Sequence, residues 1–261
     1  MSSTKRNFII LIALIFGFSL AFWLRQLYKP QLPELPETII VGTAADYPPF
    51  SFKQKDSVGN EQIVGLDIDV VAEAIRRFHK TMILKDAPFE LLIPQAQMGT
   101  IHVIAAGLSK TPEREQQVLF MPTYMPTTEL VVISLKEKPI KSLADLTDKR
   151  IVVNAGHTAD LYISNLQHVA VDRLPSPEDA INALKNGIAD AYVMEANTAE
   201  ALFDRYGIDT FHSFVIPETS GQSALAISKL YPQLAEQLSK IVDEMIADGT
   251  IEQFKQKWHM E

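Results

Sequence analysis

The sequence predicts an α/β protein that consists of two similar units. Short apolar strands alternate with amphipathic helices over short connections, a pattern typical of mostly parallel sheets. A helix, a glycine and a strand follow one another twice, at 92–104 and at 180–194. In both copies the glycine stands three residues before the polar residue that enters the strand, as in Gly99 with His102 and Gly187 with Asp190. A repeated unit of this kind predicts two similar halves.

Apolar spacing and turn residues place the other elements. Residues 66–78 have the spacing of one helix face, and the polar run 53–60 predicts a hairpin loop. Asp67 and Asp69 open that helix, where capping and dipole compensation explain them better than a metal. Further strands are expected at 38–43, 130–134, 150–154 and 224–228, and further helices at 143–147, 160–165, 198–206 and 231–247.

The N-terminus predicts export from the cytoplasm. Lys5 and Arg6 precede the apolar stretch 8–24, as in a signal peptide, and small residues allow cleavage after Ala21. The same stretch is also long enough for a short membrane anchor, so residues 1–24 are either a signal peptide or an anchor. Residues 25–37 form a proline-rich linker. The folded part is expected to begin near residue 38, in the periplasm.

Composition excludes several classes of function. The 261-residue chain has a formal net charge of −8, which disfavours binding to nucleic acid. It has no cysteine, so disulfides, thiolate metal sites and cysteine nucleophiles are excluded. Its six histidines lack metal-ligand spacing, and we expect neither a metal nor a cofactor.

The turn that follows the strand at 101–106 is the strongest candidate for a binding site. It holds Gly107, Ser109, Thr111 and Pro112 ahead of Arg114. Free amides at a helix start, with a hydroxyl and a guanidinium beside them, suit a small carboxylate. A plain capping turn with a solvated arginine would have the same residues, so the turn alone leaves both interpretations open.

Six segments taken together resemble the family-3 solute-binding group of type II periplasmic binding proteins. They are 41–50, 65–70, 89–94, 107–114, 149–156 and 247–251 with Lys257 and Trp258. The resemblance implies a two-lobed fold with two mostly parallel sheets, joined by two hinge strands. It assigns 38–128 with 223–261 to lobe 1 and 129–222 to lobe 2. It also implies a monomeric, non-catalytic receptor that delivers an amino acid to the membrane permease of an ABC importer.

The resemblance implies how the ligand's carboxylate is held. Arg114 is expected to pair with the α-carboxylate, and Ser109 and the backbone at Gly107 to bind it from the same turn. Thr158, at the start of a helix in lobe 2, is expected to meet the carboxylate when the lobes close.

The resemblance also assigns three residues to the rest of the ligand. Glu195, at the end of an apolar strand, is expected to take the α-ammonium. Tyr47 and Phe89 are expected to form two aromatic walls around the ligand side chain. From the residues alone, both rings could instead pack in the core, and Glu195 could be a solvated helix-start residue.

Departures from the family pattern predict a neutral ligand. Ala44 stands where binders of cationic amino acids often have an aspartate, and Asp46 is expected to point out of the cleft. Lys110 is expected to face solvent, which leaves no base for a glutamate. His102 is expected to be structural. His157 adjoins Thr158 and could touch the ligand, but a loop histidine is more often exposed.

Two other functions remain open from the sequence. The fold has catalytic relatives resembling cyclohexadienyl dehydratase, for which Glu195 would be the general acid. A membrane-tethered sensor would use the same clamp, provided that residues 8–24 stay in the chain.

Overall fold

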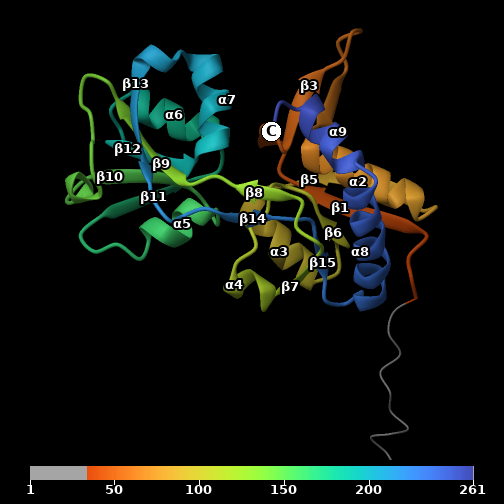
Figure 1. The fold of residues 1–261 in the computed structure, drawn as a ribbon. Helices are drawn as coiled ribbons and strands as arrows, with labels where there is room; N and C mark the ends of the chain where they lie inside the picture. Colours follow the sequence, from red (N-terminus) through yellow and green to blue (C-terminus); the bar gives the residue numbers. More distant parts are fainter. Residues whose placement is uncertain (1–33, 261) are drawn as a thin grey trace, which may run out of the picture. The chain divides into compact units, whose positions relative to one another are not determined.

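The computed structural model describes residues 34–260, which contain two five-stranded sheets with helices packed against each (Figure 1). The expected signal peptide or anchor, 1–24, and most of the expected linker, 25–37, lie outside the described residues. Within 34–260, no helix has the length and apolar character that crossing a bilayer requires.

The first lobe contains one of the two sheets. Its elements are β1 (Thr38–Thr43), β5 (Thr81–Asp86), β6 (Val103–Ile104), β7 (Val118–Phe120), β15 (Ala226–Ser228), α2 (Leu66–Arg77), α3 (Phe89–Gln97), α4 (Pro112–Glu115), α8 (Pro232–Ala247) and α9 (Thr250–Lys257). The strand order is β5-β1-β6-β15-β7, in which β5, β1 and β6 are parallel and β15 is antiparallel to both of its neighbours. Helices α2, α8 and α9 contact one another, and α3 packs on β1 and β6.

The second lobe contains the other sheet. Its elements are β9 (Leu130–Leu135), β10 (Arg150–Asn154), β11 (Ala170–Leu174), β12 (Ala191–Glu195), β13 (Phe211–Ile216), α5 (Thr158–Ile163), α6 (Pro177–Lys185), α7 (Ala196–Tyr206) and the 3₁₀ turns η1 (Leu143–Leu146) and η2 (Ile208–Thr210). The strand order is β11-β10-β12-β9-β13. Strands β11, β10 and β12 are parallel, and β9 is antiparallel to both β12 and β13. The predicted α/β class is confirmed. In each sheet, three of the five strands are parallel to one another.

The repeat predicted from the sequence is present in the two sheets. Gly99 and Gly187 end equivalent helices with positive φ of 73° and 68°. His102 then accepts the Ile40 N–H at Nδ1 over 3.1 Å, and Asp190 accepts the Arg150 N–H over 2.9 Å. Each polar residue thus ties the end of its turn to the start of the neighbouring strand, and the structural role expected for His102 is confirmed.

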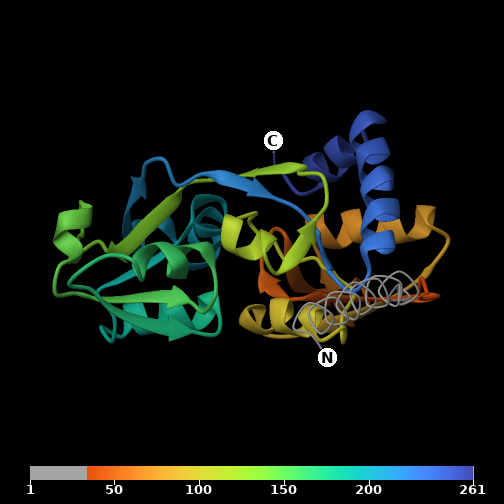
Figure 2. The ribbon, with the colours of Figure 1, turned by 90° about the horizontal axis from the view of Figure 1, so that it is seen from below.

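Two short strands join the lobes. The strands β8 (Met125–Thr127) and β14 (Gly221–Ser223) pair antiparallel, and the Gly221 N–H donates to Thr127 Oγ1 over 2.7 Å. Figure 2 shows both passing between the two sheets. The chain leaves the first sheet through β8 and returns through β14, as the expected hinge strands would. The lobe boundaries at 128/129 and 222/223 stay a prediction.

Several elements differ from the sequence analysis. It does not predict β5, β11, β13 or α9, and the expected helix at 143–147 is a 3₁₀ turn. β5 and β11 are edge strands whose residues are mostly exposed, so they lack the apolar run of a central strand. The expected hairpin is present, as β3 (Ser51–Lys55) and β4 (Glu61–Val64) beside the short β2 (Asp46–Tyr47).

Gly65 has a conformation that only glycine adopts easily. Its φ is 138°, and a Cβ at this position would lie 2.3 Å from the carbonyl oxygen of Phe50. The N–H groups of Leu66 and Asp67 donate to the carbonyl oxygens of Pro49 and Phe50 respectively. A shift of the backbone away from Phe50 would therefore break these hydrogen bonds. Gly65 therefore fixes the start of α2 against the segment that precedes β3.

We expect Gly65→Ala to lower the free energy of unfolding by about 3 kcal/mol or more, from backbone strain and overlap together. Gly187→Ala is the matched control, because Gly187 also has positive φ but nothing lies within 4 Å of its added Cβ. It should cost only about 1 kcal/mol. Urea unfolding of both variants measures the difference, and equal losses would contradict the assignment.

Candidate functional site

The turn after β6 has the structure that the sequence predicts. Pro112 begins α4, and Thr111 caps it by accepting the Arg114 N–H at Oγ1 over 3.3 Å. The plain capping interpretation also requires a solvated Arg114, which the structure contradicts, because only 3% of Arg114 is exposed. The short helix therefore carries its guanidinium inward.

Arg114 connects the two lobes. Its Nη1 donates to the Ser109 carbonyl oxygen over 2.7 Å, and its Nη2 donates to the Gly156 carbonyl oxygen over 2.9 Å. The guanidinium carbon lies 5.5 Å from the centre of the Phe89 ring. Burial lowers the pKa of Arg114 to about 10, so the side chain stays charged at neutral pH. A buried cation requires hydrogen-bond acceptors, and a carboxylate can supply two of them at once.

Asp67 holds the turn in place. Its Oδ2 accepts the Gly107 N–H and its Oδ1 accepts the Tyr124 O–H, each over 2.7 Å. No side chain caps α2, so Asp67 does not have the capping role expected of it. Burial raises the pKa of Asp67 to about 6, although both hydrogen bonds oppose this shift. Asp67 thereby links the binding turn to the segment that enters β8.

Four predicted residues meet in two pairs across the lobes. Thr158, at the start of α5, donates from Oγ1 to Ser109 Oγ over 3.1 Å. Glu195, at the end of β12, accepts a hydrogen bond from the Tyr47 hydroxyl. Burial, followed by the charge of Glu195, raises the pKa of Tyr47 well above its usual value. Glu195 is only 8% exposed, so it is not a solvated helix-start residue.

His157 lies between the two predicted aromatic walls. Its ring centre is 3.9 Å from that of Phe89 and 4.9 Å from that of Tyr47. The expectation of an exposed loop histidine is wrong, because His157 is only 7% exposed. Burial, with the charge of Arg114, lowers the pKa of His157 to about 3. Its place next to Thr158 in the sequence was the one signal that could have pointed to it.

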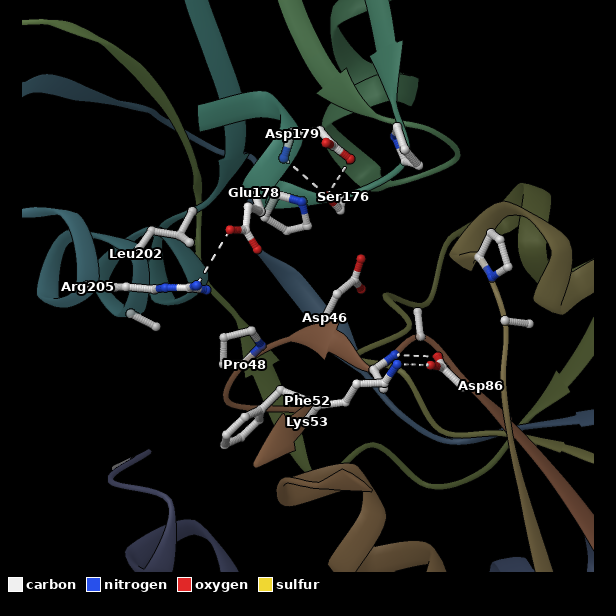
Figure 3. Close-up of a pocket in the computed structure, with 17 residues that line it drawn as sticks. Asp46, Pro48, Phe52, Lys53, Asp86, Ser176, Glu178, Asp179, Leu202 and Arg205 are labelled. Carbon is white, nitrogen blue, oxygen red and sulfur yellow. Dashed lines mark hydrogen bonds and ion pairs between the residues drawn. The ribbon is translucent and has the colours of Figure 1, made fainter. Parts of the chain in front are cut away.

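A cavity of about 620 Å³ lies beside this cluster, between β2 and the loop after β5 on one side and α6 and α7 on the other. Its charged lining residues are Asp46, Lys53, Asp86, Glu178, Asp179 and Arg205 (Figure 3). Asp86 pairs with Lys53 over 2.9 Å and Glu178 with Arg205 over 3.6 Å. Within residues 34–260, no three histidine, cysteine or acidic side chains are grouped as a metal site requires.

Asp46 faces this cavity, which corrects the expectation that it points out of the cleft. Partial desolvation and then the nearby charge of Asp86 raise its pKa to about 6. No ion pair joins Asp46 to a base among the described residues. Asp46 immediately precedes Tyr47, and the lining residue Pro88 immediately precedes Phe89. Tyr47 and Phe89 themselves do not line the cavity.

Comparison with known proteins identifies the family. Residues 39–261 match the model of the bacterial extracellular solute-binding proteins, family 3. The chain belongs to this family. The resemblance seen in the sequence is thus confirmed, and the site described above lies within the matched range.

Relatives of the chain are named as amino-acid-binding proteins, three of them as arginine-binding proteins of ABC transporters. The chain is 29% identical to the arginine-binding extracellular protein ArtP of Bacillus subtilis over 226 residues, 84% of this chain and 85% of ArtP. It is 27% identical to a probable histidine-binding protein of Campylobacter jejuni over 228 residues, 86% of each chain. These family members support the prediction of a non-catalytic protein.

Solved structures confirm the two-lobed fold. An ancestral arginine-binding protein bound to arginine matches with a TM-score of 0.78 and 30% identity, over 86% of this chain and 99% of the other. An ancestral arginine-binding protein bound to glutamine matches with a TM-score of 0.79 and 30% identity, over 87% of this chain and 100% of the other.

The link through Asp67 gives a pH-dependent prediction. In Tyr124→Phe, the buried carboxylate of Asp67 loses one donor, so we expect a loss of about 1–3 kcal/mol in unfolding free energy at pH 8. The loss in unfolding free energy should be smaller at pH 5. Asp67 is then protonated, so the missing hydroxyl no longer leaves a buried negative charge without a hydrogen-bond donor. Urea unfolding at both pH values measures this.

The control for that variant is Tyr162→Phe, which removes a hydroxyl from a partly exposed tyrosine. It should change stability by less than about 0.5 kcal/mol at either pH. A Tyr124→Phe loss that is the same at pH 5 and pH 8 would contradict the coupling to Asp67.

Proposed function

We propose that the protein is an extracytoplasmic amino-acid receptor that delivers its ligand to the permease of an ABC importer. The buried guanidinium of Arg114, placed where the two lobes meet, is the observation that supports this most directly. The names of the relatives, arginine-binding and histidine-binding, support the same class of ligand. The permease and a monomeric state are parts of this proposal.

The α-carboxylate of the ligand would pair with Arg114. The two nitrogen atoms that now donate to carbonyl oxygens of Ser109 and Gly156 are those that a carboxylate accepts in a two-pronged pair. The hydroxyls of Ser109 and Thr158 lie 3.1 Å apart and would bind the same group from both lobes. The Gly107 N–H is held by Asp67, so in this proposal Gly107 shapes the turn.

The α-ammonium would pair with Glu195. This carboxylate is buried at the end of β12 and is bound by the Tyr47 hydroxyl, which supplies one neutral donor. A ligand ammonium would add the opposite charge that a buried carboxylate requires. Tyr47 and Phe89 would then flank the ligand side chain, as the family resemblance implies.

For the ligand side chain we propose a cationic head group. The expected preference for a neutral side chain depended on the absence of an acid in the cleft, and the comparisons do not support it. Asp46 lines this cavity and has a raised pKa, which marks a carboxylate that a cation would stabilise. A side chain that passes between Tyr47 and Phe89 would lead its head group toward this acid.

The two alternative functions have less support. A dehydratase would need Glu195 as a free general acid, and Glu195 is engaged with the hydroxyl of Tyr47. A membrane-tethered sensor depends on residues 8–24, which lie outside the described part of the chain.

Arg114→Ala should weaken amino-acid binding between tens and thousands of fold, because one partner of a buried charge pair is removed. Arg114→Lys should also bind poorly, since an ammonium lacks the two-pronged geometry. Calorimetric titration with L-arginine measures both. Arg76→Ala, at an exposed arginine on α2, should bind like wild type. Wild-type affinity in either Arg114 variant would rule out the carboxylate assignment.

L-Arginine should bind roughly fivefold to tenfold more tightly than L-citrulline, its neutral isostere, at pH 7.5. Asp46→Asn should abolish this ratio, whereas Asp172→Asn, at an exposed acid on β11, should leave it unchanged. In the wild-type protein, the ratio should also decrease when the pH is lowered below about 6, because Asp46 is then protonated. Competition calorimetry measures the ratio. Tighter binding of citrulline would support the neutral preference instead.

A further inference from the structure

The segment 156–158 of the second lobe makes three successive contacts with the proposed ligand-binding groups of the first. The Gly156 carbonyl accepts from Arg114, the His157 ring lies between Phe89 and Tyr47, and the Thr158 hydroxyl donates to Ser109. The carboxylate-binding groups and both aromatic walls are thus already engaged by the protein itself.

The close approach of this segment depends on Gly156. Its φ is 74°, and an added Cβ would lie 3.3 Å from Cβ of Glu90 on α3. The backbone of the second lobe therefore rests directly on the start of α3, beside Phe89. This approach brings the centre of the His157 ring to 3.9 Å from that of the Phe89 ring, with the two ring planes tilted by 32°.

We infer that His157 is an internal competitor of the ligand. Its imidazole fills the place between Tyr47 and Phe89, and an amino-acid side chain has to displace it. This inference rests on the proposed function, since it assigns the ligand to the same place. His157 thereby sets the affinity of the site and selects side chains that replace its contacts.

Competition of this kind lowers the apparent affinity. Suppose that a ligand binds only the form with His157 displaced. Its apparent affinity is then the intrinsic affinity multiplied by the fraction of molecules in that form. Each of the two ring contacts changes the equilibrium constant for displacement of the imidazole by about twofold to tenfold. Removing the imidazole should therefore tighten ligand binding by about fourfold to a hundredfold.

Proton uptake would accompany displacement. The groups that face His157 are Tyr47 of β2, Phe89 of α3, Arg114 of α4 and Asp160 of its own helix, with Glu195 of β12 bonded to Tyr47. Burial and Arg114 keep the imidazole neutral in place, with a pKa of about 3. A displaced imidazole titrates near its usual pKa of about 6.5. Displacement therefore becomes easier as pH falls through 6.5, by about tenfold between pH 7.5 and pH 5.5.

The test compares His157→Ala with wild type after bound ligand is stripped by unfolding, dialysis and refolding. L-Arginine is the calorimetric probe at pH 7.5 and pH 5.5. His212→Ala is the matched control, because His212 is a partly buried histidine of the second lobe, on the edge strand β13. We expect tighter binding in His157→Ala alone. Protonation of Asp46 weakens arginine binding at pH 5.5 in all three proteins, so acidification should change the affinity of His157→Ala less favourably than that of wild type or His212→Ala. Weaker or unchanged binding in His157→Ala would overturn the inference.

A second measurement does not depend on the choice of ligand. The chain has no cysteine, so Asp172→Cys and Glu244→Cys place two spin labels on exposed sites, one on each lobe. Without added amino acid, we expect a longer and broader distance between the labels when His157 is replaced by alanine. The same distribution in both proteins would overturn the inference. If instead the distance changes but no amino acid binds wild type, the proposed function fails and the inference about the ligand falls with it.

Discussion

Arg114 carries a full positive charge into the contact between the two lobes, where 3% of its surface remains exposed. Burying a cation is costly unless each donor is paired, and Arg114 pairs with carbonyl oxygens on both lobes. This requirement explains why the turn around it is so tightly fixed, from the Thr111 cap to the bond between Gly107 and Asp67. A looser turn would leave the charge without its acceptors.

The internal repeat explains how residues far apart in the sequence reach this charge. In both lobes the parallel strands end at the same edge of the sheet, where open α/β sheets bind ligands. Tyr47 follows β1, the Arg114 turn follows β6, Thr158 follows β10 and Glu195 ends β12. These four strands are equivalent in pairs, β1 with β10 and β6 with β12. Each lobe therefore offers two strand ends to the other.

Local signals in the sequence pointed to this part of the site without deciding its role. The turn alone left a capping turn with a solvated arginine open, and the binding roles of Arg114 and Glu195 came from the family resemblance. What depends on contacts between distant segments was not predictable. The orientation of Asp46 depends on how β2 lies against α6, and the burial of His157 depends on the approach of the second lobe. For the same reason the edge strands β5 and β11, which have one exposed side, gave no clear pattern.

The partners of Arg114 explain why an internal competitor need not block the site. The segment 156–158 offers it only the Gly156 carbonyl dipole, and the imidazole of His157 beside it is neutral. A ligand carboxylate offers a full charge and two acceptor atoms, and hydrogen bonds to a charged group are about twice as strong as neutral ones. The proposed exchange therefore replaces weaker contacts with stronger ones at the same atoms. A segment with its own carboxylate at position 157 would satisfy Arg114 too well for an amino acid to displace it.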